Sequence, residues 1–131
     1  MTTDEFDDPT PNGELALQTI AMPSDTNPNG DIFGGWLVSQ MDLAGYITAG
    51  RVAQGRVATV SIDRMSFLVP VAVGSVVSCY TDVTHIGRSS IHITVEVWAA
   101  ESSSLDQSKV TEGNFIFVAI NANGKTRPIP S

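Results

Sequence analysis

The residues of this chain that could do chemistry lie in one stretch, residues 27–42, which reads NPNGDIFGGWLVSQMD. A turn-rich loop and a Gly34/Gly35 pair lead into an almost wholly apolar segment that is interrupted by the carboxylate of Asp42. An unpaired buried charge is costly, and desolvation makes a carboxylate more basic, so Asp42 is a candidate general base or nucleophile. The structural alternative is that Asp42 is a buried acid without a catalytic role, whose carboxylate is satisfied by hydrogen bonds or by an ion pair with Arg51 or Arg56.

The element that must carry Asp42 is a helix. The segment GGWLVSQMDLAGYITAGRVAQ has no proline over about twenty residues and has apolar side chains on nearly every side, which predicts a helix surrounded by protein. We expect it to end within residues 50–55, with Gly55 as a left-handed cap. Asp31 is expected to be the helix N-cap or to form a turn in the preceding loop.

The other elements are predicted strands. They are rich in β-branched residues or alternate between polar and apolar side chains, and they cover residues 14–22, 56–69, 75–86, 88–100 and 110–121. One strand, one helix and four strands predict an α+β fold in which a curved antiparallel sheet wraps the helix. The helix is so apolar that we expect a second subunit to cover part of it, as in an obligate dimer.

Composition excludes several classes of function. The 131 residues predict a single domain over residues 14–131, after an acidic, disordered tail over residues 1–13. Lys and Arg are not clustered, which argues against nucleic-acid binding, and no apolar run is long enough to cross a membrane. Cys79 is the single cysteine, so a disulfide within the chain and a Cys-based zinc site are excluded, and we expect no metal. Without a secretory signal, a cytoplasmic location is expected.

Four segments together resemble a known family, and they span residues 14–130 in register. They read LALQTIAMPSDTNPNGDIFGGWLVSQMD, GRVATVSIDRMSFLVPVAVGSVVSCY, VEVW and TEGNFIFVAINANGKTRPIP. The chain resembles the YciA-like group of hot-dog-fold acyl-CoA thioesterases. The resemblance implies a five-stranded antiparallel sheet around one long helix, and hydrolysis of acyl-CoA to a free acid and coenzyme A. It implies no cofactor beyond the substrate, and a dimer that forms a trimer of dimers.

The same resemblance implies catalytic roles. Asp42 matches the family's helix carboxylate, and the backbone N–H groups of Gly34 and Gly35 would form the oxyanion hole. Asn27 would orient the thioester carbonyl, although it equally suits an Asx turn. Gly35 and Asp42 are seven residues apart, about 10 Å along a helix, so one carbonyl is not expected to touch both within one chain. A site shared across a two-fold dimer is therefore expected.

Further residues are expected to contact the acyl-CoA. The turn at residues 87–90 is the preferred phosphate site, although an ordinary polar hairpin explains it equally well. Relatives are expected to have a histidine at the position of Gln54 and a more basic loop at residues 101–108, which is serine-rich here. These departures leave open both the binding site for the nucleotide part of coenzyme A and the preferred acyl group. The expected contacts are Asp31, Phe33, Ser39, Arg64, Phe67, Gly87, Arg88, Ser89 and Ser90.

Two other functions compete with hydrolysis. A non-catalytic acyl-CoA-binding or sensing domain would keep the groove but would not need the acid. A hot-dog dehydratase would need a histidine on or beside the helix, whereas His85 and His92 both lie in predicted strands and are expected to be structural or at the surface. Cys79 is expected to be an inert packed thiol.

Overall fold

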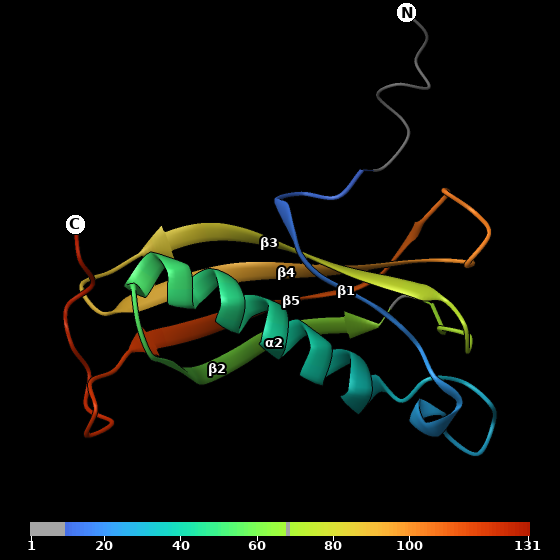
Figure 1. The fold of residues 1–131 in the computed structure, drawn as a ribbon, viewed down its shortest axis with the longest axis horizontal. Helices are drawn as coiled ribbons and strands as arrows, with labels where there is room; N and C mark the ends of the chain where they lie inside the picture. Colours follow the sequence, from blue (N-terminus) through green and yellow to red (C-terminus); the bar gives the residue numbers. More distant parts are fainter. Residues whose placement is uncertain (1–9, 68) are drawn as a thin grey trace, which may run out of the picture.

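The computed structural model describes residues 10–67 and 69–131, and it has one long helix on one curved sheet (Figure 1). Residues 1–9, which make up most of the predicted acidic tail, lie outside the described residues, as does Leu68. The elements are β1 (Glu14–Ile20), the short 3-10 helix η1 (Pro23–Asp25), α2 (Gly34–Ala53), β2 (Val57–Phe67), β3 (Val76–Ile86), β4 (Ser90–Ala100) and β5 (Ser108–Ala119). The predicted order of strand, helix and four strands is confirmed.

The strands form one antiparallel sheet in the order β1-β3-β4-β5-β2. β3 and β4 form the predicted hairpin, with Ile86 opposite Ile91 across the turn. β5 lies between β4 and β2, as its apolar character on both faces predicts. β1 and β2 are the two edges of the sheet, so each has one side without a strand partner among the described residues.

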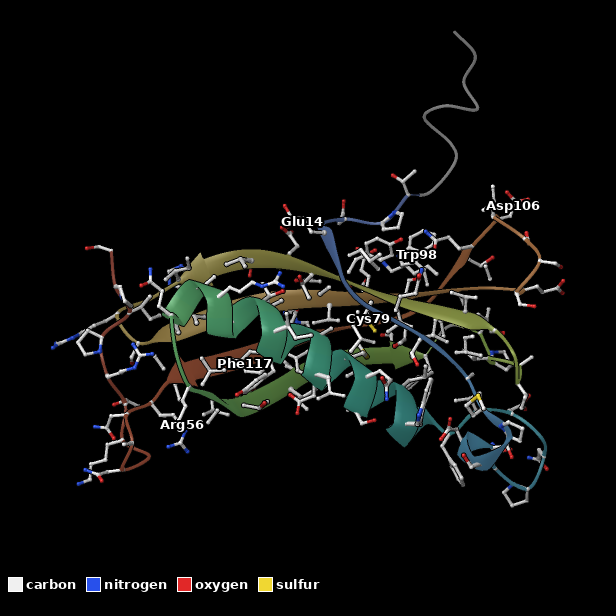
Figure 2. The ribbon with its side chains drawn as sticks, viewed as in Figure 1. Glu14, Arg56, Cys79, Trp98, Asp106 and Phe117 are labelled. Carbon is white, nitrogen blue, oxygen red and sulfur yellow. The ribbon has the colours of Figure 1, made fainter. Side chains whose placement is uncertain are left out.

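The core lies between α2 and the sheet. β4 alternates along its length, so Ile91, Ile93, Val95 and Val97 face the helix and are buried. From the helix side Leu37 and Met41 are buried, and small residues let the backbone come close. A Cβ added at Gly45 would lie 2.7 Å from the ring of Phe117, which Figure 2 shows between α2 and β5.

Within the single chain the sheet leaves part of the helix uncovered, as the sequence predicts. Only one face of α2 packs on the sheet, and on the other side Leu43 and Tyr46 keep 52% and 49% of their surface exposed. A five-stranded sheet covers one side of a helix and cannot close around it. The apolar composition of the helix therefore indicates a second apolar face that its own chain leaves uncovered.

Of the two roles predicted for Asp31, the structure supports the position in the loop turn and not the N-cap, and the predicted left-handed cap at Gly55 is wrong. The residue at the N-cap is Phe33, which makes no side-chain capping bond, whereas Asp31 lies in the loop and forms an isolated bridge with Ala72. At the other end Gln54, with a φ of 53°, takes the left-handed position that we expected of Gly55. The left-handed conformation of Gln54 ends the helix one residue before the predicted cap, and the N–H of Gly55 then donates to the carbonyl of Gly50 at 3.2 Å.

The opposite face of the sheet carries a buried polar cluster around Glu96. The Trp98 indole N–H donates to Glu96 Oε1 at 2.9 Å, and Lys109 lies 3.8 Å from Glu96 Oε2 while also contacting Glu112. The backbone N–H of Asn12 donates to Glu96 at 3.4 Å. Each of these groups is satisfied by its neighbours, so the cluster joins the chain before β1 to the middle of the sheet.

Candidate active site

Asp42 lies in the third turn of α2 and points toward β2. Its Oδ1 accepts a hydrogen bond from the Thr59 hydroxyl at 2.6 Å, and the residue is half-buried in the single chain. Of the predicted structural partners, Arg56 instead donates to the carbonyls of Asn121 and Ala122, and no ion pair of Arg51 or Arg56 occurs in residues 10–67 and 69–131. Asp42 is thus held by a neutral donor and has no cationic neighbour in the chain described.

The loop before the helix is held by its own turns. Asn27 Oδ1 accepts from the backbone N–H groups of Asn29 at 2.9 Å and Asp31 at 3.1 Å, which is the Asx turn that was one of its two predicted roles. The N–H of Phe33 donates to the carbonyl of Asp25, and that of Ile32 donates to the carbonyl of Val71. The start of α2 is thereby fixed against η1 and against the connection from β2 to β3.

The first amides of the helix are free within this frame. The N–H groups of Trp36 and Leu37 both donate to the carbonyl of Phe33, whereas those of Gly34 and Gly35 have no partner among the described residues. A Cβ at Gly35 would meet nothing within 4 Å, and one at Gly34 would lie 3.4 Å from the ring of Phe67. Two unpaired donors at a helix N-terminus, with open space before Gly35, are suited to a developing oxyanion.

A pocket of about 340 Å³ lies at this end of the helix, and we call it the loop pocket. It brings together four residues predicted for the site, Asn27, Asp31, Gly34 and Phe67. Sequence reasoning missed its apolar walls, which come from Ile32, Leu37, Val69, Pro70 and Val71. The apolar run at residues 69–71, Val-Pro-Val, is the sequence signal that could have identified part of these walls. The sequence-based prediction assigns it only to a strand end and a turn.

Asp42 is not part of the loop pocket. It lies seven residues beyond Gly35 on the same helix, about 10 Å along the axis, and its carboxylate is hydrogen bonded to Thr59 near the start of β2. Thr59, which holds it, was not predicted. No pattern in the sequence reveals that β2 runs beside this turn of the helix.

The predicted phosphate contacts lie apart from each other. Arg64 sits at an irregularity in β2, with a φ of 56° and with its N–H donating to Asp63 Oδ1, opposite the Glu112 and Asn114 region of β5. The turn at residues 87–90 lies at the other end of the sheet, where Ser90 pairs with Val118. There the Arg88 carbonyl accepts from the N–H of Ile129, and the N–H of Gly87 donates to Ser90.

The remaining candidates have structural surroundings. Ser39 is exposed, and its hydroxyl donates to the carbonyl of Trp36 at 2.7 Å, while Phe33 is half-exposed beside the loop pocket. His85 and His92 face each other across β3 and β4, with ring centroids 5.2 Å apart. Burial raises the pKa of the Cys79 thiol to about 12, which keeps it protonated and unreactive.

Within residues 10–67 and 69–131, no group of three or more His, Cys, Asp or Glu side chains is placed to hold a metal ion. Over the same residues, α2 and η1 are too short or too polar to cross a membrane.

An exposed apolar surface lies beside Asp42, and we call it the β2–α2 surface. It consists of Leu43 and Tyr46 on the helix and of Val60 and Ile62 on the edge strand, each at least 44% exposed. Its strand has no partner on its outer side among the described residues. An apolar patch next to an open strand edge is typical of a protein interface.

Comparison with known proteins gives consistent matches. Residues 29–105 match the family model of the thioesterase superfamily. The acyl-CoA thioester hydrolase YciA of Salmonella typhimurium is 54% identical over 126 residues, which cover 94% of this chain and 95% of that protein. Among solved structures, the hexameric thioesterase y2039 from Yersinia pestis is 56% identical, with a TM-score of 0.89 over 93% of this chain and 99% of that one. HI0827, a hexameric broad specificity acyl-coenzyme A thioesterase, is 49% identical, with a TM-score of 0.89 over 95% and 86% of the two chains.

Proposed function

The chain belongs to the YciA group of the thioesterase superfamily, and from this membership we propose that it hydrolyses acyl-CoA thioesters to a free carboxylic acid and coenzyme A. The observation that carries the proposal is the pair of free amides at Gly34 and Gly35 on the same helix as the carboxylate of Asp42. Those are the two groups that hydrolysis of a thioester needs: an anion-stabilising donor and a base or nucleophile.

The reaction breaks the bond between the carbonyl carbon and sulfur. In one route Asp42 takes a proton from water, whose oxygen attacks the carbonyl carbon; in the other the carboxylate attacks first, and water then hydrolyses the anhydride. In both routes the carbonyl oxygen gains negative charge, which the amides of Gly34 and Gly35 stabilise. The sulfur leaves as a thiolate and is protonated to the thiol of coenzyme A.

The active site would be shared between two chains. Within one chain Asp42 is about 10 Å along the helix from the free amides, too far for one carbonyl to contact both. A two-fold axis at the β2–α2 surface would set Asp42 of one chain against the glycine loop of the other. The hexameric state of y2039 and HI0827 supports self-association, and we propose dimers assembled as a trimer of dimers.

The ends of the substrate would lie in different places. The loop pocket, with Asn27, Asp31, Phe33 and Phe67 in or beside it, would hold the group next to the thioester. Ser39, one turn before Asp42, would assist at the reacting water. The coenzyme A phosphates would meet Arg64 or the turn at residues 87–90, which are the two basic sites proposed for them.

The test is an assay of thiol release over a panel of acyl-CoAs, with Asp42→Asn as the diagnostic variant. The substitution keeps the shape and the bond from Thr59 but removes the base, so turnover should fall by at least about a thousandfold while the fold is retained. The matched control is Asp82→Asn, an exposed aspartate on β3, which should leave the rate unchanged.

Two results would contradict the proposal. A folded Asp42→Asn protein with wild-type turnover would remove Asp42 from the mechanism. Wild-type protein that binds acyl-CoA without releasing thiol would favour the sensing domain.

Cys79, buried and with its pKa raised, has no disulfide partner in the chain, and a reducing location such as the cytoplasm is proposed on that ground.

A further inference from the structure

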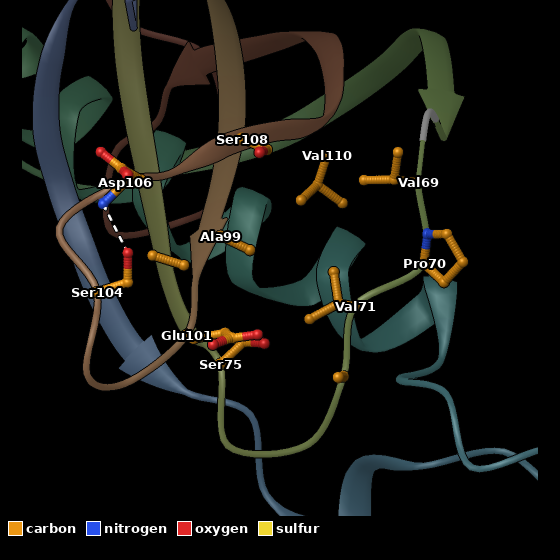
Figure 3. Close-up of a pocket in the computed structure, with 12 residues that line it drawn as sticks. Val69, Pro70, Val71, Ser75, Ala99, Glu101, Ser104, Asp106, Ser108 and Val110 are labelled. Carbon is orange, nitrogen blue, oxygen red and sulfur yellow. Dashed lines mark hydrogen bonds between the residues drawn. The ribbon is translucent and has the colours of Figure 1, made fainter.

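A second hollow lies behind the loop pocket, and we call it the rear pocket. It has a volume of about 490 Å³ and lies between the β2–β3 connection and the loop from β4 to β5. Figure 3 shows Val69, Pro70 and Val71 along one side of it and Glu101, Ser104 and Asp106 along the opposite side. The same three residues, Val69 to Val71, also line the loop pocket, so a single segment of chain is the wall between the two hollows.

This wall is fixed at Val71. The carbonyl of Val71 accepts from the N–H of Ile32 at 3.0 Å, and the next residue, Ala72, forms a bridge with Asp31. Only 2% of Val71 is exposed, whereas 44% of Val69 is. Val71 is therefore the residue of the wall whose side chain fills space between the two pockets and has no freedom to swing away.

The chemistry of the two pockets indicates which part of an acyl-CoA would pass this wall. Besides Asn27 and Asp31, the loop pocket is lined by apolar side chains next to the free amide of Gly34, and this apolar part suits the acyl chain of a thioester held at that amide. The rear pocket continues with Ala99 and Val110 near the wall and has the carboxylates of Glu101 and Asp106 at its rim. Those carboxylates would repel the phosphates of coenzyme A, so only the acyl end suits this direction.

We propose that Val71 determines the acyl chain length that the enzyme accepts, by closing the loop pocket from the rear pocket. The proposal rests on the proposed thioesterase function. Truncation at Val71 would join the two hollows and let a longer acyl chain extend toward Ala99 and Val110. Each methylene newly buried would favour the longer substrate by about fourfold in kcat/KM, the equivalent of about 0.8 kcal/mol.

The experiment measures kcat/KM for straight-chain acyl-CoAs from acetyl-CoA to palmitoyl-CoA. In Val71→Ala the ratio of long-chain to short-chain kcat/KM should rise by more than about tenfold, which is the combined effect of burying two or more additional methylenes at about fourfold each. Val71→Ile, which adds volume at the same place and keeps the wall, should shift the preference to shorter chains. The control is Val73→Ala, at a half-exposed valine in the adjoining turn that lines neither pocket, and its profile should match the wild type.

A double variant tests whether the rear pocket is the space used. Ala99 lines the rear pocket but not the loop pocket, so Ala99→Leu in the Val71→Ala background should restore the short-chain preference. A uniform change in kcat/KM across the panel for Val71→Ala and Val71→Ile, or a long-chain gain that Ala99→Leu leaves intact, would overturn the proposal. A wild-type protein that hydrolyses no acyl-CoA would instead overturn the proposed function, so the two failures are distinguishable.

Discussion

Asp42 is held by a bond that comes from outside its own helix. The Thr59 hydroxyl on β2 is 2.6 Å from Oδ1, and the second oxygen accepts no hydrogen bond from the described side chains. A carboxylate with one oxygen anchored and the other available can direct its free lone pairs at a water or a carbonyl carbon. In the proposed mechanism Thr59 would therefore act as the positioning residue of Asp42.

Replacing Thr59 tests that dependence. Thr59→Val keeps the shape of the side chain but removes the hydroxyl that donates to the Asp42 carboxylate. A hydrogen bond to a charged group contributes about 1.5–3 kcal/mol, so kcat should fall by about tenfold or more with little change in KM. Thr59→Ser retains the hydroxyl and should recover most of the rate. Steady-state kinetics of both variants, with unfolding midpoints to exclude loss of fold, make the measurement. Wild-type kcat in Thr59→Val would show that Asp42 works without this bond.

At the scale of elements, α2 must lie close to the sheet to bring Asp42 to Thr59. Gly45 sits on the buried side of the helix one turn after Asp42, where an added Cβ would be 2.7 Å and 2.8 Å from two carbons of the Phe117 ring. This contact has no room for a methyl group. The distance between helix and sheet is therefore set by a glycine, and the position of the Asp42 carboxylate beside β2 depends on it.

Gly45→Ala should destabilise the fold by about 1–3 kcal/mol, because the overlap with Phe117 outweighs the better helix propensity of alanine. The matched control is Gly50→Ala in the same helix, where the added Cβ would meet the carbonyl of Gly55 at an ordinary 3.7 Å. That variant should gain up to about 1 kcal/mol. Urea unfolding of the two variants separates overlap from propensity, and equal stability would contradict the close packing of α2 on β5.

The elements themselves could be predicted from sequence, but their contacts could not. The proline-free apolar run predicts α2, and the period-two alternation within residues 88–100 predicts β4, each to within one or two residues. The bond from Thr59, the shared wall at Val71 and the cap at Gln54 depend on which segments meet in space. Local propensity favours glycine at the cap, yet Gln54 takes the left-handed conformation one residue earlier.

At the scale of the whole molecule, the β2–α2 surface should be an interface in solution. Leu43→Glu would place a charge in its centre, and burial of an unpaired carboxylate costs several kcal/mol, so the assembly should dissociate. Thiol release should fall with it, since the site would lose the partner's loop. The control is Leu105→Glu, at a fully exposed leucine in the loop from β4 to β5, which should change neither. Light scattering after size exclusion gives the mass, and an unchanged mass for Leu43→Glu would contradict the interface.

The strand order has a consequence for how the chain is made. Among the described residues β2 has one strand neighbour, β5, and β5 follows the other four strands along the chain, so it leaves the ribosome after them. Until residues 108–119 emerge, β2 has no partner and the buried side of α2 lacks Phe115 and Phe117, so the nascent chain exposes the apolar surface that later becomes the core. The sheet is therefore completed only after β5 has been synthesised, and a chain that stops before β5 would leave Thr59 and Asp42 without the sheet that aligns them.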